Sequence, residues 1–348
     1  MAQRRRKKPR KASHGALIFW AAVFVLLVAA LAVFAVQAVQ SPFGPETETL
    51  VRIAPGASTT QIARQLEQEG VLRTRYSFYL LRWFRRGVLK AGEYRFDHPA
   101  TAAEVYSRIA RGDVYTIALT VPEGANIFEV AARVEQSGLA TRQDFLKAAV
   151  EQISLVGDID PQARSLEGYL FPDTYRFSPP VSAAGIAAAM VRRFRVAAKE
   201  AGLIDNVHKT VTLASLVERE TAIASERPLV ASVYTNRLLK KMPLMADPSV
   251  IYGLELEGRW RGAIYASDLK NDTAYNTYLH AGLPPGPIAN PGLPSLQAAV
   301  NPAQTGFLFF VAASASDPQG HSIFSATMDE QARNVAEYRK TKKRAGAR

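Results

Sequence analysis

No cysteine occurs among the 348 residues of this chain. Disulfide bonds, thiol nucleophiles and cysteine-ligated metal sites are therefore excluded. Histidine is also scarce: the five histidines are scattered, with no H-E-x-x-H motif and no pair four residues apart. Glycine-rich nucleotide-binding loops of both common types are missing. We therefore expect no metal ion, nucleotide or other cofactor.

The sequence also lacks the motifs of serine enzymes. Ser267-Asp-Leu-Lys270 matches the S-x-x-K pattern of penicillin-binding enzymes, but the companion motifs K-T-G and S-D-N are absent. No G-x-S-x-G motif is present either. A serine at the N-terminal cap of a helix explains the tetrapeptide better than a nucleophile does.

A long apolar run near the N-terminus predicts a membrane anchor. Ala16 to Val36 is apolar over 21 residues, enough for a helix with a rise of about 1.5 Å per residue to cross a hydrocarbon core of about 30 Å. The apolar core of a signal peptide is shorter, at about 7–15 residues. We therefore expect an uncleaved transmembrane helix over residues 15–39, followed by a Pro- and Gly-containing linker over residues 40–48.

Basic residues are concentrated at the two ends of the chain. Seven lie between residues 4 and 11 and six between 339 and 348, so residues 12–338 carry a formal charge of −1 although the whole chain carries +12. The body thus has no basic surplus, and nucleic acid is not an expected partner. The first cluster places a segment of residues 1–14 in the cytoplasm, and the rest of the chain outside the membrane. The basic tail, residues 339–348, is expected to be a solvated, disordered end.

An internal repeat follows the linker. Residues 53–71 align with residues 121–139 at an offset of 68, with six identities in 19 positions. Each copy predicts a strand, a turn containing glycine, an N-cap (Ser58 or Asn126) and an amphipathic helix that ends at a glycine. Two copies are too few for a solenoid, so we expect duplicated small α/β units.

The remaining periodicities predict an α+β fold. They indicate helices over residues 75–86, 101–111, 228–241 and 328–340, and mainly helical structure over 183–221. Strands are expected over 91–96 and 116–121. A buried strand over 307–311 is expected to pair with a strand over 321–325.

One acidic residue stands out as a candidate for chemistry. Glu218 ends the apolar segment Leu213-Ala-Ser-Leu-Val-Glu218. Desolvation by such neighbours disfavours the charged carboxylate and raises its pKa, which suits a general acid near neutral pH. The alternative is an ordinary surface glutamate in the last turn of a helix. Glu220 would point away from Glu218 on a helix, so the two cannot flank one bond.

Other polar and aromatic residues are typical of a groove for a neutral, sugar-like ligand. Asp173 and Asp247 lie in segments that mix aromatics, proline and acid, although an aspartate before threonine or proline is more often a turn former. Hydrolysis of a glycoside would need a second carboxylate about 5–10 Å away, and the sequence does not locate one. Aromatic residues suited to sugar faces, part of which would serve core packing, are Tyr169, Tyr175, Tyr252, Trp260, Tyr265, Tyr275 and Tyr278.

Five motifs in order give the chain a family resemblance. They are Leu166-Glu-Gly-Tyr-Leu-Phe-Pro-Asp-Thr-Tyr175, Ala214-Ser-Leu-Val-Glu-Arg-Glu-Thr221, Asp247-Pro-Ser-Val-Ile-Tyr-Gly253, Tyr275-Asn-Thr-Tyr278 and Gly282-Leu-Pro-Pro-Gly-Pro-Ile288. Together with the basic N-terminus, the single anchor and the repeat, they resemble the YceG-like (MltG-type) endolytic murein transglycosylases.

The resemblance implies a division of the chain and a set of site residues. Residues 49–115 would form a LysM-like module, and residues 116–338 a catalytic region with the second repeat unit at 116–160. The catalytic glutamate falls on Glu218. The residues expected to bind substrate are Glu167, Asp247, Tyr252, Tyr275, Asn276 and Tyr278.

The reaction implied is cleavage of the MurNAc-β-1,4-GlcNAc bond inside a peptidoglycan strand without water. Glu218 would protonate the leaving oxygen and then take the proton of the MurNAc C6 hydroxyl, which gives a 1,6-anhydro end. Anchored in the bacterial inner membrane, the enzyme would cut nascent strands and set their length. Penicillin-binding proteins would be its partners.

Two other functions remain open at this point. A muramidase-type hydrolase shares the glutamate but yields reducing ends. A non-catalytic scaffold would bind the cell wall through the repeat, and Glu218 would then be incidental.

Overall fold

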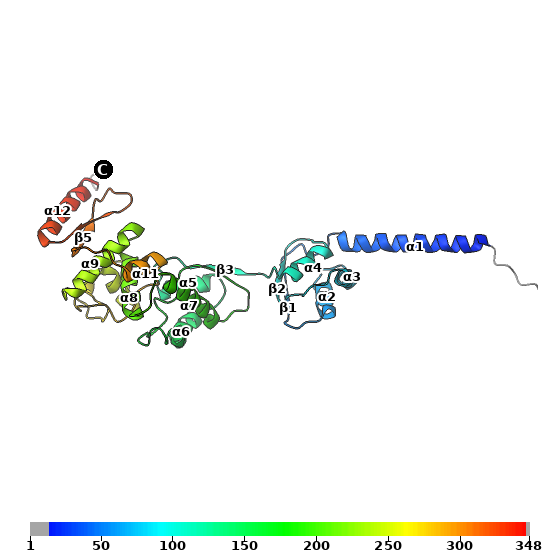
Figure 1. Ribbon diagram of the computed structural model, residues 1–348, viewed down its shortest axis with the longest axis horizontal. Helices are drawn as coiled ribbons and strands as arrows, with labels where there is room; N and C mark the ends of the chain where they lie inside the picture. The colour runs from blue at the N-terminus through cyan, green and yellow to red at the C-terminus, as the bar shows by residue number, and fades with distance from the viewer. Residues whose placement is uncertain (1–13, 346–348) are drawn as a thin grey trace, which may run out of the picture. The chain divides into compact units, whose positions relative to one another are not determined.

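The computed structural model describes residues 14–345. Within this range the chain forms two compact units that divide after Thr116, the first blue to cyan and the second cyan to red in Figure 1. Nearly all of the basic segment expected at residues 1–14, and the last three residues of the basic tail, lie outside the described range.

The first unit begins with the expected apolar helix. Helix α1 spans His14–Gln40, one residue longer at each end than predicted. Within residues 14–345 it is the one helix long and apolar enough to cross a membrane, over Leu17–Gln40. Its apolar side chains are exposed rather than buried against the rest of the chain, which is compatible with a single-pass anchor.

A small α/β module follows α1. Its elements are β1 (Thr49–Ile53), α2 (Thr59–Gln68), α3 (Arg75–Phe84), β2 (Gly92–Phe96) and α4 (Ala102–Arg111). Strands β1 and β2 pair antiparallel, with Thr49 opposite Phe96. Capping boxes at Ser58 and Thr101 start α2 and α4. These bounds agree with the periodicity of the sequence to within two residues.

The second unit opens with the second copy of the repeat. It comprises β3 (Ile117–Thr120), α5 (Ile127–Gln136), α6 (Arg142–Glu151), a 3₁₀ turn η1 (Ile153–Leu155) and β4 (Thr174–Phe177). β4 pairs antiparallel with β3, with Thr120 opposite Thr174. The copies therefore share the order strand, helix, helix, strand. The strand that closes the second copy lies beyond residue 160, because a long loop separates it from α6.

Helices form most of the rest of the second unit. They are α7 (Ala183–Glu200), α8 (Val207–Glu220), α9 (Arg227–Leu239), α10 (Asp247–Leu256) and α11 (Leu293–Val300), with 3₁₀ turns η2 (Ala224–Glu226) and η3 (Asp268–Lys270). The helical stretch predicted over 183–221 is two helices. α7 ends just before Gly202, which is left-handed with φ of 74°, and the N–H of Leu203 bonds back to the carbonyl of Ala198. Asn206, just before α8, is also left-handed with φ of 50°.

Helix α8 lies at the centre of this group. Its residues 211–217 are all buried, and it contacts α9, α10 and α11. Figure 1 shows α9 and α11 beside it. A helix that is buried on nearly all faces needs the apolar sequence seen here. Its last turn, with Glu218, emerges from the core beside α9 and α11.

The chain ends in a hairpin and a helix. Strands β5 (Phe309–Ala312) and β6 (Ser322–Ser325) pair antiparallel as expected, with Phe309 opposite Ser325, and α12 spans Met328–Ala345. The expected disorder of the basic tail is wrong for residues 339–345, because they continue this helix. The prediction of a fully buried strand over 307–311 is wrong. β5 is only half-buried, because one two-stranded sheet and one helix cannot enclose it.

Candidate active site

The side chain of Glu218 is buried at the end of α8, with 4% of its surface exposed. Its Oε1 accepts a hydrogen bond of 2.9 Å from Arg227 Nη2. Its Oε2 accepts one of 2.9 Å from the backbone N–H of Gly292, the N-cap residue of α11. The carboxyl is therefore held in one orientation by two donors from two different elements.

Burial raises the pKa of Glu218 above its ordinary value. The hydrogen bond from Gly292 and the charge of Arg227 oppose this shift, and the nearby Glu123 carboxylate adds to it, but desolvation is the largest cause. Glu218 thus keeps its proton to a higher pH than an exposed glutamate does. This is the property that the apolar neighbours in the sequence predict.

A second carboxylate lies close to Glu218. Arg227 Nη2 also donates to Glu123 Oε2, at 3.3 Å, so both carboxyls meet the same nitrogen. The Arg227 side chain is 6% exposed and that of Glu123 is 47% exposed. Glu123 therefore links the buried pair to the surface. Neither Arg227 nor Glu123 was among the candidate residues predicted from the sequence.

Glu123 belongs to the glycine turn of the second repeat copy. That turn has the same backbone in both copies, with φ of 78° at Gly56 and 76° at Gly124. The residue before the glycine is Pro55 in the first copy and Glu123 in the second. An acid that replaces a proline within the repeat is the signal that could have identified Glu123.

The loop before α11 packs tightly against this turn. A Cβ on Gly292 would lie 2.1 Å from Glu123 Oε1, so the position cannot hold a larger residue without a shift. Ser295, in the first turn of α11, is buried close to Glu218 and lowers its pKa slightly, yet its hydroxyl meets no partner at hydrogen-bonding distance.

A surface hollow of about 370 Å³ lies beside the turn. Its walls come from the turn, from α5 and from the end of α8, and comprise Pro122, Glu123, Gly124, Ala125, Glu129, Ala132, Arg133, Gln136 and Arg219. Arg219 Nη1 donates to the carbonyl of Gly124 at 3.0 Å and fixes α8 to the turn. Of Glu218, Arg227 and Glu123, only Glu123 lines this hollow.

The structure places Glu167 in the interior. Its side chain accepts hydrogen bonds from the backbone N–H of Ile127 (2.8 Å) and from Asn290 Nδ2 (3.1 Å), and burial raises its pKa to about 8. Asn290 also donates to the carbonyl of Ala125. These contacts join the start of α5 to the loop that carries Gly292. Contact of Glu167 with a sugar stays a prediction.

Among the other predicted binding residues, Tyr252 and Tyr275 lie near Glu167: burial and then the Glu167 carboxyl raise the pKa of both phenols. Tyr252 and Tyr275 contact each other edge to face, with ring centroids 5.0 Å apart. Separately, Tyr278 donates a hydrogen bond of 2.6 Å to Asp247 Oδ1 at the start of α10. Asn276 is fully buried and orders its own loop by donating to the carbonyls of Leu269 and Asn271.

Glu220 has different neighbours from Glu218. Its Oε2 accepts a hydrogen bond of 2.9 Å from Tyr234, and burial raises its pKa too. The helical spacing predicts this separation. Within residues 14–345 no group of three or more acidic or histidine side chains could hold a metal ion.

Comparison with known proteins gives the family. Residues 51–337 match the YceG-like family. The endolytic murein transglycosylase of Bacillus subtilis is 30% identical over 84% of this chain and 85% of its own length. That of Streptococcus pneumoniae strain R6 is 28% identical over 91% of this chain but only 64% of its own length. A crystal structure of a YceG-like protein from Listeria monocytogenes superposes with a TM-score of 0.54 at 31% identity, covering 83% of this chain and 99% of that one. The chain therefore belongs to the YceG-like family.

Proposed function

We propose that this chain is a membrane-anchored lytic transglycosylase that cleaves MurNAc-β-1,4-GlcNAc bonds within peptidoglycan strands. One observation carries the proposal: Glu218 is buried, its pKa is raised and its carboxyl is fixed by two donors. The names of the relatives in Bacillus subtilis and Streptococcus pneumoniae support the same class of reaction.

Glu218 serves first as acid and then as base in this reaction. Its protonated carboxyl gives the proton to the glycosidic oxygen as the bond from that oxygen to C1 of MurNAc breaks. The resulting carboxylate then accepts the proton of the MurNAc C6 hydroxyl while O6 bonds to C1. The products are a 1,6-anhydroMurNAc end and a free GlcNAc hydroxyl, and Glu218 recovers its proton without water.

Arg227 and Gly292 are placed to stabilise Glu218 after it has given up its proton. Their N–H groups point at the two carboxyl oxygens, and they stabilise the carboxylate that forms when the proton leaves. Glu123 shares Arg227 Nη2 and so takes up part of its positive charge. This sharing weakens the effect by which Arg227 favours the charged form of Glu218.

A muramidase-type hydrolase remains the second candidate because of Glu123. Retaining glycosidases hold two carboxyls about 5–5.5 Å apart, and here both carboxyls lie within 3.3 Å of one nitrogen. In that mechanism Glu123 would stabilise or attack C1 and water would complete the cleavage. The transglycosylase is favoured because Glu123 is held by Arg227 and the relatives carry that name.

The test compares the products of the full chain and two variants on uncrosslinked glycan strands by mass spectrometry. Glu218→Gln should abolish cleavage. Glu220→Gln is the matched control, since Glu220 lies on the same helix and also has a raised pKa; it should keep most of the activity. Anhydro ends support the proposal and reducing ends support the hydrolase. Activity that persists in Glu218→Gln contradicts both.

We further propose how the rest of the chain serves the reaction. The order β1, α2, α3, β2 with antiparallel strands supports a LysM-like module at residues 49–115. The basic residues before α1 support a cytoplasmic N-terminus and an exported body. The enzyme would then cut nascent strands close to the bilayer, next to the penicillin-binding proteins that extend them.

A further inference from the structure

Helix α3 has two apolar faces. Phe78 and Leu81 are buried in the core of the first unit. Tyr76, Trp83 and Phe84 form a second stripe, with Leu80 between them, at the helical spacing i, i+4, i+7 and i+8. Tyr76 is 65% exposed, Trp83 80% and Phe84 75%. A helix with an apolar outer face lies against something other than water.

The residues after α3 continue this surface. Val88 is 79% exposed. Four basic residues are interspersed with the apolar ones: Arg82, Arg85, Arg86 and Lys90. In the part of the chain that the structure describes, none of the four forms a salt bridge with a carboxylate. We call residues 76–90 the α3 surface. Aromatic residues flanked by unpaired cations are typical of segments that lie in a membrane interface.

The α3 surface begins where α1 ends. A cavity of about 160 Å³ is lined by Phe34, Gln37 and Ala38 of α1 together with Arg73, Thr74 and Ser77 at the start of α3. Helices α1 and α3 are in direct contact. A ten-residue helix is about 15 Å long. If α1 spans a bilayer, the whole of α3 therefore lies close to the point where α1 leaves the apolar core.

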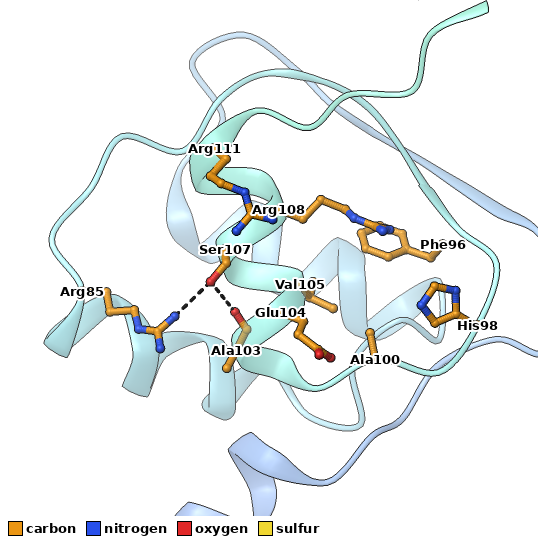
Figure 2. Close-up of a pocket in the computed structure, with 10 residues that line it drawn as sticks. All are labelled: Arg85, Phe96, His98, Ala100, Ala103, Glu104, Val105, Ser107, Arg108 and Arg111. Atoms are coloured by element: carbon orange, nitrogen blue, oxygen red, sulfur yellow. Dashed lines mark hydrogen bonds between the residues drawn. The ribbon is translucent and has the colours of Figure 1, made fainter.

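A second basic feature adjoins the same surface. Figure 2 shows Arg85, Arg108 and Arg111 around a pocket of about 410 Å³ on α4, with Glu104 as the acid in its wall. Arg85 Nη1 donates to Ser107 Oγ at 2.9 Å, and Arg111 pairs with Asp113. Guanidinium groups are well suited to phosphate oxygens. The positive charge thus extends from α3 onto α4.

We propose that the α3 surface binds an anionic phospholipid bilayer. Trp83 and Phe84 enter the boundary between headgroups and acyl chains, while Arg82, Arg85, Arg86 and Lys90 contact headgroup phosphates. The inference deepens the proposed function, because it rests on α1 being a membrane anchor. On this proposal the first unit lies against the membrane surface through α3, in addition to being attached to the membrane through α1.

The three tryptophans of the chain make a direct test possible. Trp20 lies in α1, Trp83 in the α3 surface and Trp260 in the second unit. Three variants of the full chain each keep one tryptophan and carry Phe at the other two positions. They are placed in nanodiscs of phosphatidylcholine with phosphatidylglycerol, with or without bromine on the acyl chains. Brominated lipid quenches only tryptophans that reach the acyl region.

We expect Trp83 to be quenched at least twofold and its emission to lie at shorter wavelength than that of Trp260. Changing Arg82, Arg85, Arg86 and Lys90 together to Gln should lower the quenching of Trp83 and leave that of Trp20 unchanged. If Trp20 is quenched and Trp83 is not, the proposed membrane contact of the α3 surface is overturned, α1 remains a membrane anchor, and the α3 surface would instead bind a protein partner. Equal quenching of Trp83 and Trp260 also overturns the proposed membrane contact.

If Trp20 is not quenched, α1 is not a membrane anchor. Cleavage of glycan by the same samples tests the proposed reaction separately.

Discussion

Arg227 and Glu218 form a buried hydrogen-bonded pair, with Nη2 and Oε1 2.9 Å apart and side chains that are 6% and 4% exposed. A pair enclosed in this way is weakly screened by water, so the charge of Arg227 acts on the protonation of Glu218. The pair lies at the meeting point of α8, α9 and the loop before α11. Chemistry and stability are therefore coupled at this point of the structure.

Removing the charge of Arg227 should shift the pH dependence of activity to higher pH. Arg227 favours the charged form of Glu218, so Arg227→Met should raise the pKa of Glu218 further. The proton donor then survives to higher pH, and the alkaline limb of kcat/KM against pH should shift to higher pH. The variant should also lose about 2–4 kcal/mol of stability, less than the full cost of an unpaired buried charge because Glu218 can stay protonated. A shift of the limb to lower pH would contradict this account.

Neutralising Glu123 should have the opposite effect. Its carboxylate raises the pKa of Glu218, and Glu123→Gln leaves Arg227 wholly to Glu218. The pKa of Glu218 should fall, and the alkaline limb should move to lower pH with activity retained below it. Loss of activity at every pH would instead indicate that Glu123 takes part in the bond cleavage, as in a hydrolase. Glu129→Gln, on the wall of the same hollow, is the matched control.

A side chain at position 292 should destabilise the protein, and removing the Glu123 side chain should relieve this effect. Because a Cβ there would lie 2.1 Å from Glu123 Oε1, Gly292→Ala should cost about 1–3 kcal/mol of stability. The same change in a Glu123→Ala background should cost much less, and a double-mutant cycle with thermal unfolding measures the difference. Gly306→Ala, where nothing lies within 4 Å of the added Cβ, should be close to neutral. A cost of Gly292→Ala that is independent of Glu123 would show a different cause.

The buried Glu167 should make stability fall as pH rises. Burial raises its pKa to about 8, whereas the unfolded chain releases this proton near pH 4.3. Between these values the unfolded state has lost the proton and the folded state still holds it, so rising pH favours unfolding. Glu167→Gln loses one hydrogen-bond acceptor and should be destabilised at pH 5, but by less at pH 8. Thermal unfolding of both proteins across pH 5–8.5 checks this, and a difference that does not change with pH would contradict it.

Local signals in the sequence account for most of the elements. Ser58, Asn126 and their following glycines predict the starts and ends of α2 and α5, which the structure confirms. α10 was missed because Asp247-Pro248 reads as a turn, although proline is equally at home in the first turn of a helix. The break between α7 and α8 was missed although Gly202, a left-handed glycine with φ of 74°, follows the last turn of α7 and is a typical signal for the end of a helix.

The site itself depends on contacts between distant parts of the chain. Burial of Glu218 follows from its apolar neighbours in sequence, and is seen. Its meeting with Glu123, nearly a hundred residues earlier, depends on how the second repeat packs against α8. The pattern of apolar residues along the sequence does not predict how the second repeat packs against α8. Glu167 was predicted to bind substrate because it lies in one of the family motifs, but the structure places its side chain in the interior.

The central claim is that Glu218 drives cleavage without water, and isotope labelling tests it most directly. Glycan strands are cut by the full chain in water enriched in oxygen-18, and the new MurNAc ends are analysed by mass spectrometry. The account predicts 1,6-anhydro ends with no oxygen-18, because O6 of the same sugar closes onto C1. Reducing ends that carry one oxygen-18 would contradict it and would make the enzyme a hydrolase with Glu123 as the second carboxylate.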